Sequence, residues 1–436
     1  MATGDRTGER NVTDAADMTQ LTQARRAATP RTGHDAEMSW IIRHAQPRLR
    51  STPLRHDRLV PLTDIAAEQW QGLADRAVEP NAYYLPDWEA AVNASARDRG
   101  GAMALTAWGH VDGAGDATAR LIGLLPVVSA WRAYRIPIPA LVSADAYGPL
   151  GTALLDRDAA DEAAHRMLRQ AREAGTRALI LRDVPLQGPA LAAFTRTLAA
   201  DGLTPHVLQS RDRAGLDATR DVEDLLRDAL GPKKLKELRR QRNRLAEHGE
   251  VTFTIARRPD EIARALDIFL ALEASGWKAQ RGTAISQHDG DLHFIRRATA
   301  ALSARGQCEI ATLMAGTTPV ASGLLLRHLD RAYWFKLGFD EQFARTSPGV
   351  QLALDLTRHL CGDPAIAFVD SSTNAGPSMI DPIWRARLAI GDVLIPLRRN
   401  DPMIAAIRIA LRLRKLAREP ARRLVHSLRA FQERRR

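Results

Sequence analysis

The residues best suited to bind a ligand lie at a predicted strand-to-helix turn, in the segment Arg345–Val350. Ser347 is a favourable N-cap residue, and Pro348 suits the first helical position because it has no amide proton to leave unpaired. The amides of the next three residues are expected to point out of the helix start, where the helix dipole attracts anions. Gly349 lets a ligand approach the backbone closely, and Arg345 adds a positive charge. The pattern predicts a pyrophosphate cradle; the alternative is an ordinary capped helix on the surface.

The elements that position this turn follow from hydrophobic periodicity. In Arg331–Phe339, one set of side chains beginning with Tyr333 alternates with a second set beginning with Trp334, which is typical of a strand. From Leu352 to Leu360, leucines recur at every fourth position, which is the spacing of a helix face. The sequence therefore predicts a strand, a short connection and a helix over residues 331–360.

The length and the charge of the chain limit its possible domain organisation. A chain of 436 residues with 45% hydrophobic and 26% charged residues is expected to form two globular domains plus tails. The net charge of +11 is concentrated in two segments. Residues 401–436 contain eleven Lys/Arg and three Asp/Glu, and residues 231–248 contain seven and two. These segments, rather than the near-neutral remainder, would carry any attraction to phosphate or to a membrane.

The two cysteines and the surroundings of His288 argue against a disulfide framework or a metal site. Cys308 and Cys361 are the two cysteines of the sequence, and they match neither a disulfide scaffold nor a zinc cluster. His288 has no further His or Cys at ligand spacing, so we expect no metal. The amino-terminal segment lacks an apolar signal core, and no run is long and apolar enough to span a bilayer. We therefore expect a cytoplasmic protein in a reducing compartment.

The predicted fold is α/β with a duplicated unit. In each half, strands joined by tight turns precede a helix that ends at glycine and an apolar strand that ends in aspartate, from Gly175 to Asp183 and from Gly362 to Asp370. The first half has no counterpart of the Arg-x-Ser-Pro-Gly helix start, so we expect the second half to bind any phosphate-bearing donor. The predicted parts are a disordered leader (1–55), a first domain (56–230), a basic linker helix (231–248), a second domain (249–400) and a basic amphipathic tail (401–436).

Both basic segments are predicted to be helical. Residues 231–248 surround a thin leucine stripe with Lys and Arg, which suits either a solvated linker helix or an arm that contacts phosphate. Residues 401–436 are expected to form two helices separated by Pro420, the first with an apolar side from Ile404 to Leu411. A basic amphipathic helix either packs its apolar side on its own domain or lies on an anionic membrane surface.

The order of elements resembles a bacterial acyltransferase family. A basic helix, a strand, a helix ending in Ser275-Gly276-Trp277-Lys278 and three strands lead to Tyr333–Asp340 and then to Ser347-Pro348-Gly349. This order resembles the tandem-GNAT proteins labelled cellulose-biosynthesis (CelD-like) acetyltransferases, which are similar in architecture to Fem-type aminoacyltransferases of peptidoglycan synthesis. The likeness extends over Pro61–Arg398 and is specific over Lys233–Asp370. It implies two tandem GNAT-like (acyl-CoA N-acyltransferase) domains with mixed sheets flanked by helices, the second binding the donor.

The resemblance also assigns roles to the helix start and its surroundings. The residues that take the place of the GNAT pyrophosphate loop are Arg345, Ser347, Pro348, Gly349 and Val350. This chain has Gly349 alone where the family's loop has Arg/Gln-x-x-Gly-x-Gly/Ala, and the donor expected there is acetyl-CoA or another acyl-CoA. Trp277, Lys278 and Tyr333 are expected to line the acceptor groove, with packing at the helix end or within the sheet as the alternative.

Three residues are candidates for the chemistry of acyl transfer. Transfer from a thioester requires deprotonation of the acceptor and stabilisation of a developing oxyanion. Lys336 and Asp340 lie late on the strand that leads into the cradle, and Asp370 ends the next strand. A carboxylate there would act as a base or orient the acceptor, while the alternative is a helix cap or a surface ion pair.

These features fit three functions. The first is an acyltransferase that moves an acetyl or other acyl group from acyl-CoA to an amine or hydroxyl of a sugar or cell-envelope (exopolysaccharide) precursor. The second is a Fem-like transferase that uses a charged tRNA, which the basic segment Lys233–Arg244 motivates. The third is a non-catalytic scaffold of a polysaccharide-synthesis complex. In each case residues 401–436 are a candidate for peripheral contact with the inner membrane.

Overall fold

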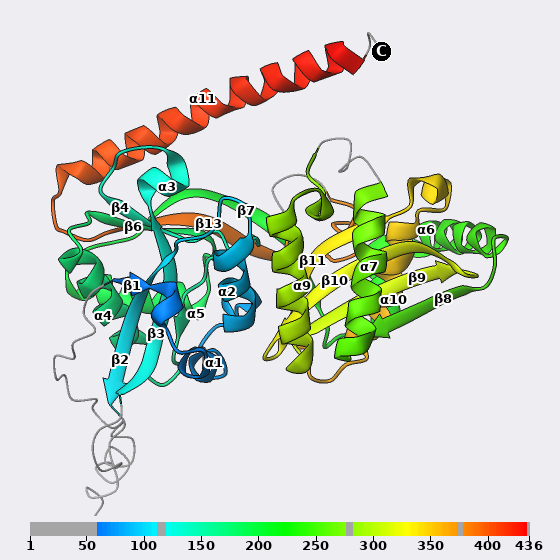
Figure 1. The fold of residues 1–436 in the computed structure, drawn as a ribbon, viewed down its shortest axis with the longest axis horizontal. Helices are drawn as coiled ribbons and strands as arrows, with labels where there is room; N and C mark the ends of the chain where they lie inside the picture. The colour runs from blue at the N-terminus through cyan, green and yellow to red at the C-terminus, as the bar shows by residue number, and fades with distance from the viewer. Residues whose placement is uncertain (1–58, 111–118, 276–281, 374–377, 434–436) are drawn as a thin grey trace, which may run out of the picture. The chain divides into compact units, whose positions relative to one another are not determined.

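The computed structural model describes residues 59–433 except 111–118, 276–281 and 374–377, with side chains described up to residue 417 (Figure 1). The predicted leader, residues 1–55, and the predicted acceptor-groove residues Trp277 and Lys278 lie outside the described residues.

The first half of the described chain is an α/β unit. In order its elements are β1 (Val60–Pro61), η1 (Leu62–Asp64), α1 (Ala67–Ala74), η2 (Ala82–Tyr84), α2 (Pro86–Ser95), β2 (Met103–His110), β3 (Ala119–Ser129), α3 (Ala130–Tyr134), β4 (Ala140–Ser143), β5 (Leu154–Leu155), α4 (Ala160–Glu173), β6 (Ala178–Pro185), α5 (Pro189–Ala200) and β7 (His206–Asp217). The chain leaves α4 through Gly175, whose φ of +77° is a left-handed conformation that glycine adopts without steric cost. The predicted helix end at Gly175 is confirmed.

The second half repeats the alternation of helices and strands. In order its elements are α6 (Val222–Ala246), β8 (Val251–Ala256), α7 (Pro259–Ser275), η3 (Ile285–Gln287), α9 (Asp289–Ala304), β9 (Cys308–Ala315), β10 (Thr318–His328), β11 (Arg331–Phe339), η4 (Glu341–Thr346), α10 (Pro348–Cys361), β12 (Phe368–Asp370), β13 (Ala386–Pro396) and α11 (Pro402–Glu433). The three consecutive strands predicted before the turn at Ser347 are β9, β10 and β11.

The last strand of each half is exchanged with the other half. The strands of the described chain form one mixed sheet in the order β1-β2-β3-β4-β6-β13-β7-β12-β11-β10-β9-β8, with β5 beside β3. In this order β13, from the second half, pairs with β6 of the first, and β7, from the first half, pairs with β12 of the second. The predicted α/β class with mixed sheets and flanking helices is confirmed, and the two sheets are continuous through β7 and β13.

The duplication is visible in the parallel pair at the centre of each half. Residues 140–142 of β4 pair in parallel with residues 178–180 of β6, and residues 331–333 of β11 pair with residues 368–370 of β12. Beyond these short pairs the strands separate, since β12 ends at Asp370 while β11 continues to Phe339. In the second half this separation opens the sheet on the carboxyl side of β12.

Helices cover both faces of the second half's strands. Figure 1 shows α7 and α9 on one face of β9–β11, with α10 on the other. The predicted leucine face is buried, since Leu352, Leu356 and Leu360 of α10 are each at most 1% exposed. Full burial of one such side chain stabilises the fold by roughly 1.5–3 kcal/mol. This packing fixes the start of α10 against the edge of β11.

The two basic helices differ from the prediction in where the helix is interrupted. In α6, Gly231 takes φ +70° and ψ 166°, which kinks the helix at the residue where the basic segment begins. The predicted break at Pro420 is wrong, because α11 runs as one helix from Pro402 to Glu433. Proline removes one helical hydrogen bond, and strong helix formers on both sides outweigh that loss in a helix with an exposed face. Among the described helices, none is long and apolar enough to cross a membrane.

Candidate active site

A pocket of about 230 Å³ lies where β11 and β12 separate. Its walls come from the end of β11, from the residues that follow β12 and from the segment that leads to β13. The lining residues are Trp334, Phe335, Lys336, Leu337, Ser371, Ser372, Thr373, Ser378, Met379 and Ile380. Five of the ten lining residues are apolar, and the other five supply one ammonium group and four hydroxyls.

The start of α10 differs in detail from the predicted cradle. Pro348 occupies the first helical turn as expected, but Ser347 is left-handed (φ 51°, ψ 55°) and its side chain makes no capping hydrogen bond. Instead, the carbonyl of Ser347 accepts the amides of Val350 at 2.9 Å and Gln351 at 3.0 Å. The prediction that these amides point away from the helix is wrong, because the carbonyl of the N-cap residue Ser347 accepts both of them at the first helical turn. The Gly349 amide is the remaining candidate donor to an anion.

Gly349 lies directly behind the pocket wall. A β-carbon built on it would be 3.1 Å from Leu337 Cδ2 and 3.2 Å from Met379 Sδ, and both of these side chains line the pocket. A larger residue would therefore push the wall inward. Arg345, four residues earlier, is exposed and forms no ion pair with a described residue.

The basic half of α6 packs beside this helix start. Gln351 Nε2 donates to the carbonyl of Leu238 at 2.9 Å, and Arg242 pairs with Asp355 of α10 at 2.8 Å. Other cations of the same helix are exposed and lie outside the ion pairs of the described chain. These are Lys233, Lys236, Arg239, Arg240 and Arg244. They place positive charge close to the amino terminus of α10, whose dipole has the same sign.

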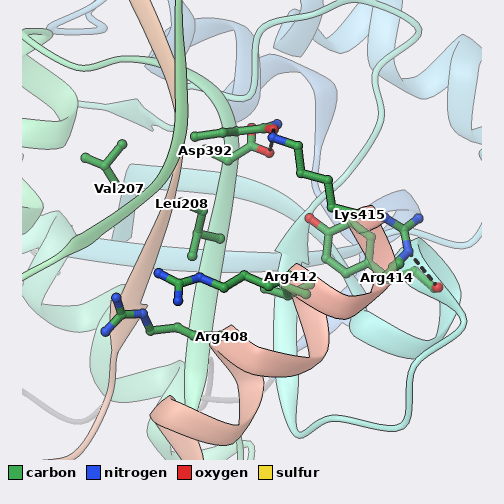
Figure 2. Close-up of a pocket in the computed structure, with 10 residues that line it drawn as sticks. Val207, Leu208, Asp392, Arg408, Arg412, Arg414 and Lys415 are labelled. Atoms are coloured by element: carbon green, nitrogen blue, oxygen red, sulfur yellow. Dashed lines mark hydrogen bonds between the residues drawn. The ribbon is translucent and has the colours of Figure 1, made fainter. Parts of the chain in front are cut away.

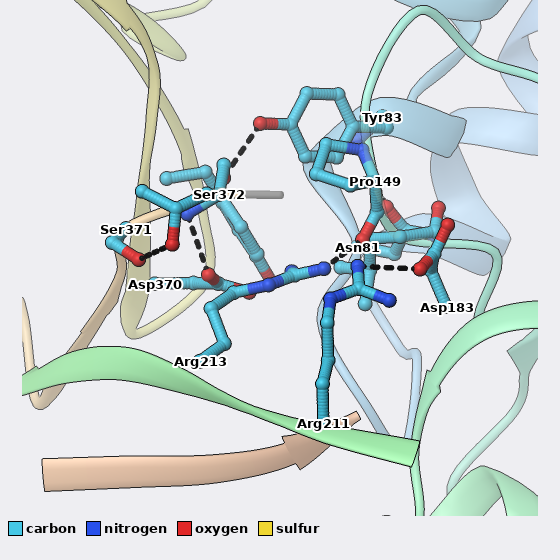
Figure 3. A network of polar contacts seen from close by, with 12 residues as sticks. Asn81, Tyr83, Pro149, Asp183, Arg211, Arg213, Asp370, Ser371 and Ser372 are labelled. Carbon is cyan, nitrogen blue, oxygen red and sulfur yellow. Dashed lines mark hydrogen bonds and ion pairs between the residues drawn. The ribbon is translucent and has the colours of Figure 1, made fainter. Parts of the chain in front are cut away.

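Asp370, a predicted catalytic residue, is held in a buried network at the base of the opening (Figure 3). Its Oδ2 accepts from Arg213 Nη1 at 2.9 Å, and its Oδ1 accepts the amide of Ser372 at 2.7 Å. Arg213 also donates to the carbonyl of Pro149 in the first half at 2.5 Å. Both oxygens of the carboxylate are thus engaged, and Asp370 is not among the residues that line the pocket.

Of the other predicted residues, which lie on β11 or directly after it, two are outside the pocket lining and one is part of it. Asp340 accepts the amide of Gln342 at 2.9 Å and caps η4, outside the pocket lining. The hydroxyl of Tyr333 donates to the carbonyl of Pro80 at 2.6 Å, and burial raises its pKa well above the ordinary value. Lys336 does line the pocket, with Nζ 3.5 Å from Glu273 Oε1. Of the three predicted catalytic residues, Lys336 is therefore the one at the opening.

Glu273 is a site residue that the sequence reasoning missed. It is 1% exposed at the end of α7, and its Oε2 accepts the amide of Ile285 at 2.9 Å. A signal was present, because Glu273 follows Phe269 by four residues and so extends the apolar face of α7. A carboxylate on a buried helix face requires a partner, and Lys336 is that partner.

The hydroxyls after β12 were also missed. Tyr83 of the first half donates to Ser372 Oγ at 2.7 Å, and Ser371 Oγ lies 3.0 Å from Thr373 Oγ1. The signal is the run Ser371–Thr373 directly after a buried strand. Ser378 Oγ is buried and has no hydrogen-bond partner among the described atoms. The pocket therefore combines apolar walls with hydroxyls. This composition suits an extended organic ligand that contains amide groups.

Comparison with known proteins identifies the class of the second half. Residues 232–375 match a family described as Acetyltransferase (GNAT) domain. The second half therefore carries an acyltransferase-type domain, and its β11–turn–α10 segment lies within the matched residues. A search of curated proteins gives no match.

Solved structures are similar to this chain at low sequence identity. A structure described as FemX is 11% identical, with a TM-score of 0.51, over 79% of this chain and 98% of that chain. The C-terminal domain (DUF2156) of a putative lysylphosphatidylglycerol synthetase from Agrobacterium fabrum is 14% identical, with a TM-score of 0.48, over 79% and 95%. A tandem GNAT protein from the clavulanic acid biosynthesis pathway is 15% identical, with a TM-score of 0.35, over 79% and 99%. This chain and FemX therefore share a fold.

No group of three His, Cys, Asp or Glu side chains in the described part of the chain is arranged to hold a metal ion. The pocket composition is likewise that of an organic ligand site, since its lining contains one charged residue, Lys336.

Proposed function

We propose that the protein is an acyl-CoA-dependent acyltransferase whose reaction takes place where β11 and β12 separate. The acceptor is an amine or hydroxyl of a sugar or cell-envelope (exopolysaccharide) precursor, as expected for the CelD-like branch of GNAT proteins. The observation that carries the proposal is the placement of the pocket directly in front of Gly349, at the amino terminus of α10. The match of residues 232–375 to an acetyltransferase family supports it.

The anionic end and the pantetheine arm of the donor would bind to different parts of this arrangement. Its anionic end would meet the Gly349 amide, Arg345 and the exposed cations of α6, which together give the positive potential that a pyrophosphate requires. Its pantetheine arm would run along the edge of β11 into the pocket, between Leu337 and Met379. When bound, acyl-CoA would supply the thioester carbonyl that the acceptor attacks; the new bond to the acceptor nitrogen or oxygen replaces the C–S bond, and CoA leaves as the thiol with the proton lost by the acceptor.

Lys336 is the group suited to assist the reaction. As the acceptor attacks, negative charge develops on the carbonyl oxygen, and an ammonium group in a largely apolar pocket stabilises that charge. The Lys336 Nζ lies 5.3 Å from the centroid of the Tyr147 ring and 3.5 Å from Glu273 Oε1. Glu273, itself fixed by the Ile285 amide, acts as a positioning residue for Lys336.

Calorimetric titration of CoA and acetyl-CoA into the full chain tests the proposal. Wild-type protein is expected to bind both ligands, and Arg345→Ala to bind them more weakly. The matched control is Arg264→Ala, which removes an exposed arginine of α7 remote from the helix start. Absence of binding to the wild type, or equal binding by wild type and Arg345→Ala, would remove the basis for the donor site.

The exposed cations of α6 favour a second candidate, a transferase that takes its acyl group from a charged tRNA. Phosphate contacts of this kind weaken steeply with salt. The quadruple change Lys233→Glu, Lys236→Glu, Arg239→Glu and Arg240→Glu should abolish salt-dependent tRNA binding if this candidate is right. Binding of CoA together with salt-insensitive or absent tRNA binding would favour the acyl-CoA reaction. If the protein binds neither CoA nor tRNA, the non-catalytic scaffold is the candidate that remains.

A further inference from the structure

Helix α11 leaves a continuous apolar face exposed. Ile409, Leu413 and Leu416 are 56%, 61% and 64% exposed, and they recur at helical spacing. The exposed residues on the same side of the helix are all apolar. They are Ala405, Ala406, Ile409, Leu413, Leu416 and Ala417. An isolated exposed leucine is ordinary, but an unbroken face of this kind indicates a surface that is covered by a partner.

The opposite side of α11 is anchored to the first half of the chain. Ile404 and Ile407 are buried in the main core, and Arg414 Nε donates to the carbonyl of Tyr134 at 3.1 Å. The Arg414 guanidinium also lies 4.6 Å from the centroid of the Tyr134 ring. The helix is therefore held with its apolar face outward, and packing on its own domain does not bury that face.

Cations flank the apolar face and line a pocket of about 320 Å³ beneath the helix (Figure 2). Arg408, Arg412, Arg414 and Lys415 contribute to the lining, together with a single carboxylate, Asp392. That carboxylate accepts from the amide of Asp183 and from Gln209 Nε2, and burial raises its pKa. The surroundings of the helix are thus strongly positive.

An exposed aromatic side chain lies on the short helix that α11 contacts. Trp131 is 55% exposed on α3, the short helix that ends with Tyr134, the residue contacted by Arg414. Exposed tryptophan is enriched at the boundary between lipid headgroups and acyl chains, because the indole ring has an apolar body and a polar N–H.

We propose that α11 is a membrane-docking helix that lies on the surface of an anionic phospholipid bilayer. The apolar face of Ile409, Leu413 and Leu416 enters the acyl boundary, while Arg412 on its flank contacts lipid phosphates and Lys415, whose ammonium donates to Gln209 Oε1 at 3.4 Å, adds to the positive potential. This combination of an apolar face and flanking cations is the pattern of interfacial helices. The inference does not depend on the acyl-transfer reaction.

Charge decides between a bilayer and a second copy of the chain. A symmetric contact pairs the same patch of both subunits. A second copy seated on this face would therefore bring its own Arg412, and the positive potential of the neighbouring cations, against those of the first. An anionic lipid surface brings the opposite charge to the same residues.

Co-sedimentation of the full chain with vesicles tests the proposal. Wild-type protein should bind vesicles that contain phosphatidylglycerol, bind phosphatidylcholine vesicles weakly, and be released by salt. The double change Leu413→Gln and Leu416→Gln should reduce partitioning by about tenfold or more, since it removes apolar area from the docking face. The matched control is Leu329→Gln, an exposed leucine in the turn between β10 and β11.

The charge contribution has its own pair of variants. Arg412→Gln with Lys415→Gln should weaken binding to phosphatidylglycerol vesicles and flatten its salt dependence. The control, Arg258→Gln with Arg264→Gln, removes two exposed arginines far from α11 and should bind as the wild type does. Circular dichroism melts check that each variant is folded.

Three results would overturn the proposal. One is no binding of wild-type protein to phosphatidylglycerol vesicles. A second is unchanged binding by the folded Leu413→Gln, Leu416→Gln variant, which would place the contact elsewhere in the chain. The third is a wild-type dimer in sedimentation equilibrium that this variant abolishes, which would assign the face to a second copy.

Discussion

Arg213 and Asp370 form a buried ion pair, with 2.9 Å between Nη1 and Oδ2, that joins the exchanged strand β7 to β12. Two residues earlier on β7, Arg211 pairs with Asp183 of β6 at 2.6 Å. Asp183 and Asp370 are the aspartates that follow the duplicated helix and strand in each half. One strand therefore supplies a guanidinium to the equivalent carboxylate of both halves (Figure 3).

Removing one partner of the Arg213–Asp370 pair should destabilise the protein strongly. Both side chains are at most 5% exposed, so Asp370→Asn leaves the guanidinium buried without a charge partner. The expected loss is about 3–5 kcal/mol in the free energy of unfolding, measured by urea denaturation.

A surface pair provides the control for this prediction. Arg296 and Asp267 are similarly close, at 2.7 Å, but are at least half exposed. Asp267→Asn should change stability by no more than about 1 kcal/mol, because water screens exposed charges. Equal losses at the two sites would contradict the structural role assigned to Asp370.

Substitutions of Gly349 should weaken donor binding in proportion to side-chain size. A β-carbon would approach Leu337 and Met379 to just over 3 Å, and both of those side chains are flexible at the contact. Gly349→Ala is therefore expected to bind CoA with a modest loss, whereas Gly349→Val should lose about tenfold or more as the pocket wall moves inward. Calorimetry measures the affinity, and a melt measured alongside separates loss of binding from loss of fold.

Lys336 and Glu273 should act as a unit in the reaction. Lys336→Met is expected to lower kcat about 100-fold or more with little change in KM for acetyl-CoA, because its charge acts on the transition state. Glu273→Gln should have a smaller effect on kcat, and the double variant should lose less than the two single losses combined. Release of CoA thiol with an amino-sugar acceptor measures these values. Independent losses in the two variants would contradict the coupling.

Glu79 should make stability fall as pH rises toward neutrality. Burial raises its pKa from 4.5 to about 7, while the Ala190 amide and Arg331 oppose the shift. Between these two values the folded protein binds a proton that the unfolded chain has released, so stability decreases as pH rises through this window.

The Glu79→Gln variant isolates this contribution. The amide oxygen of glutamine preserves an acceptor for Ala190, which donates to Glu79 Oε2 at 3.1 Å. Relative to the variant, the wild type should lose up to about 3 kcal/mol between pH 4.5 and 7. Urea denaturation across this range measures the difference, and parallel stability curves for the two proteins would show that Glu79 does not carry the proton.

The local part of the candidate site was predictable from the sequence. Strand β11, the turn and α10 follow from alternation, from the leucine spacing and from Pro348 at the first helical turn. These patterns depend on neighbours a few residues apart, so a linear sequence contains them. The left-handed turn at Ser347 was not predictable in this way, because serine at that position usually caps through its hydroxyl.

The sequence by itself determined the α/β alternation, the duplicated unit, the helix start at Pro348-Gly349 and the two basic helices. The tertiary structure alone decided the exchange of β7 and β13, the partners of Asp370 and Glu273, and the side of α11 that faces outward. The physical reason is the separation in sequence over which each interaction acts. Periodicity and capping act within one element, whereas Arg213 and Asp370 are 157 residues apart, and only the folded sheet brings their charges together.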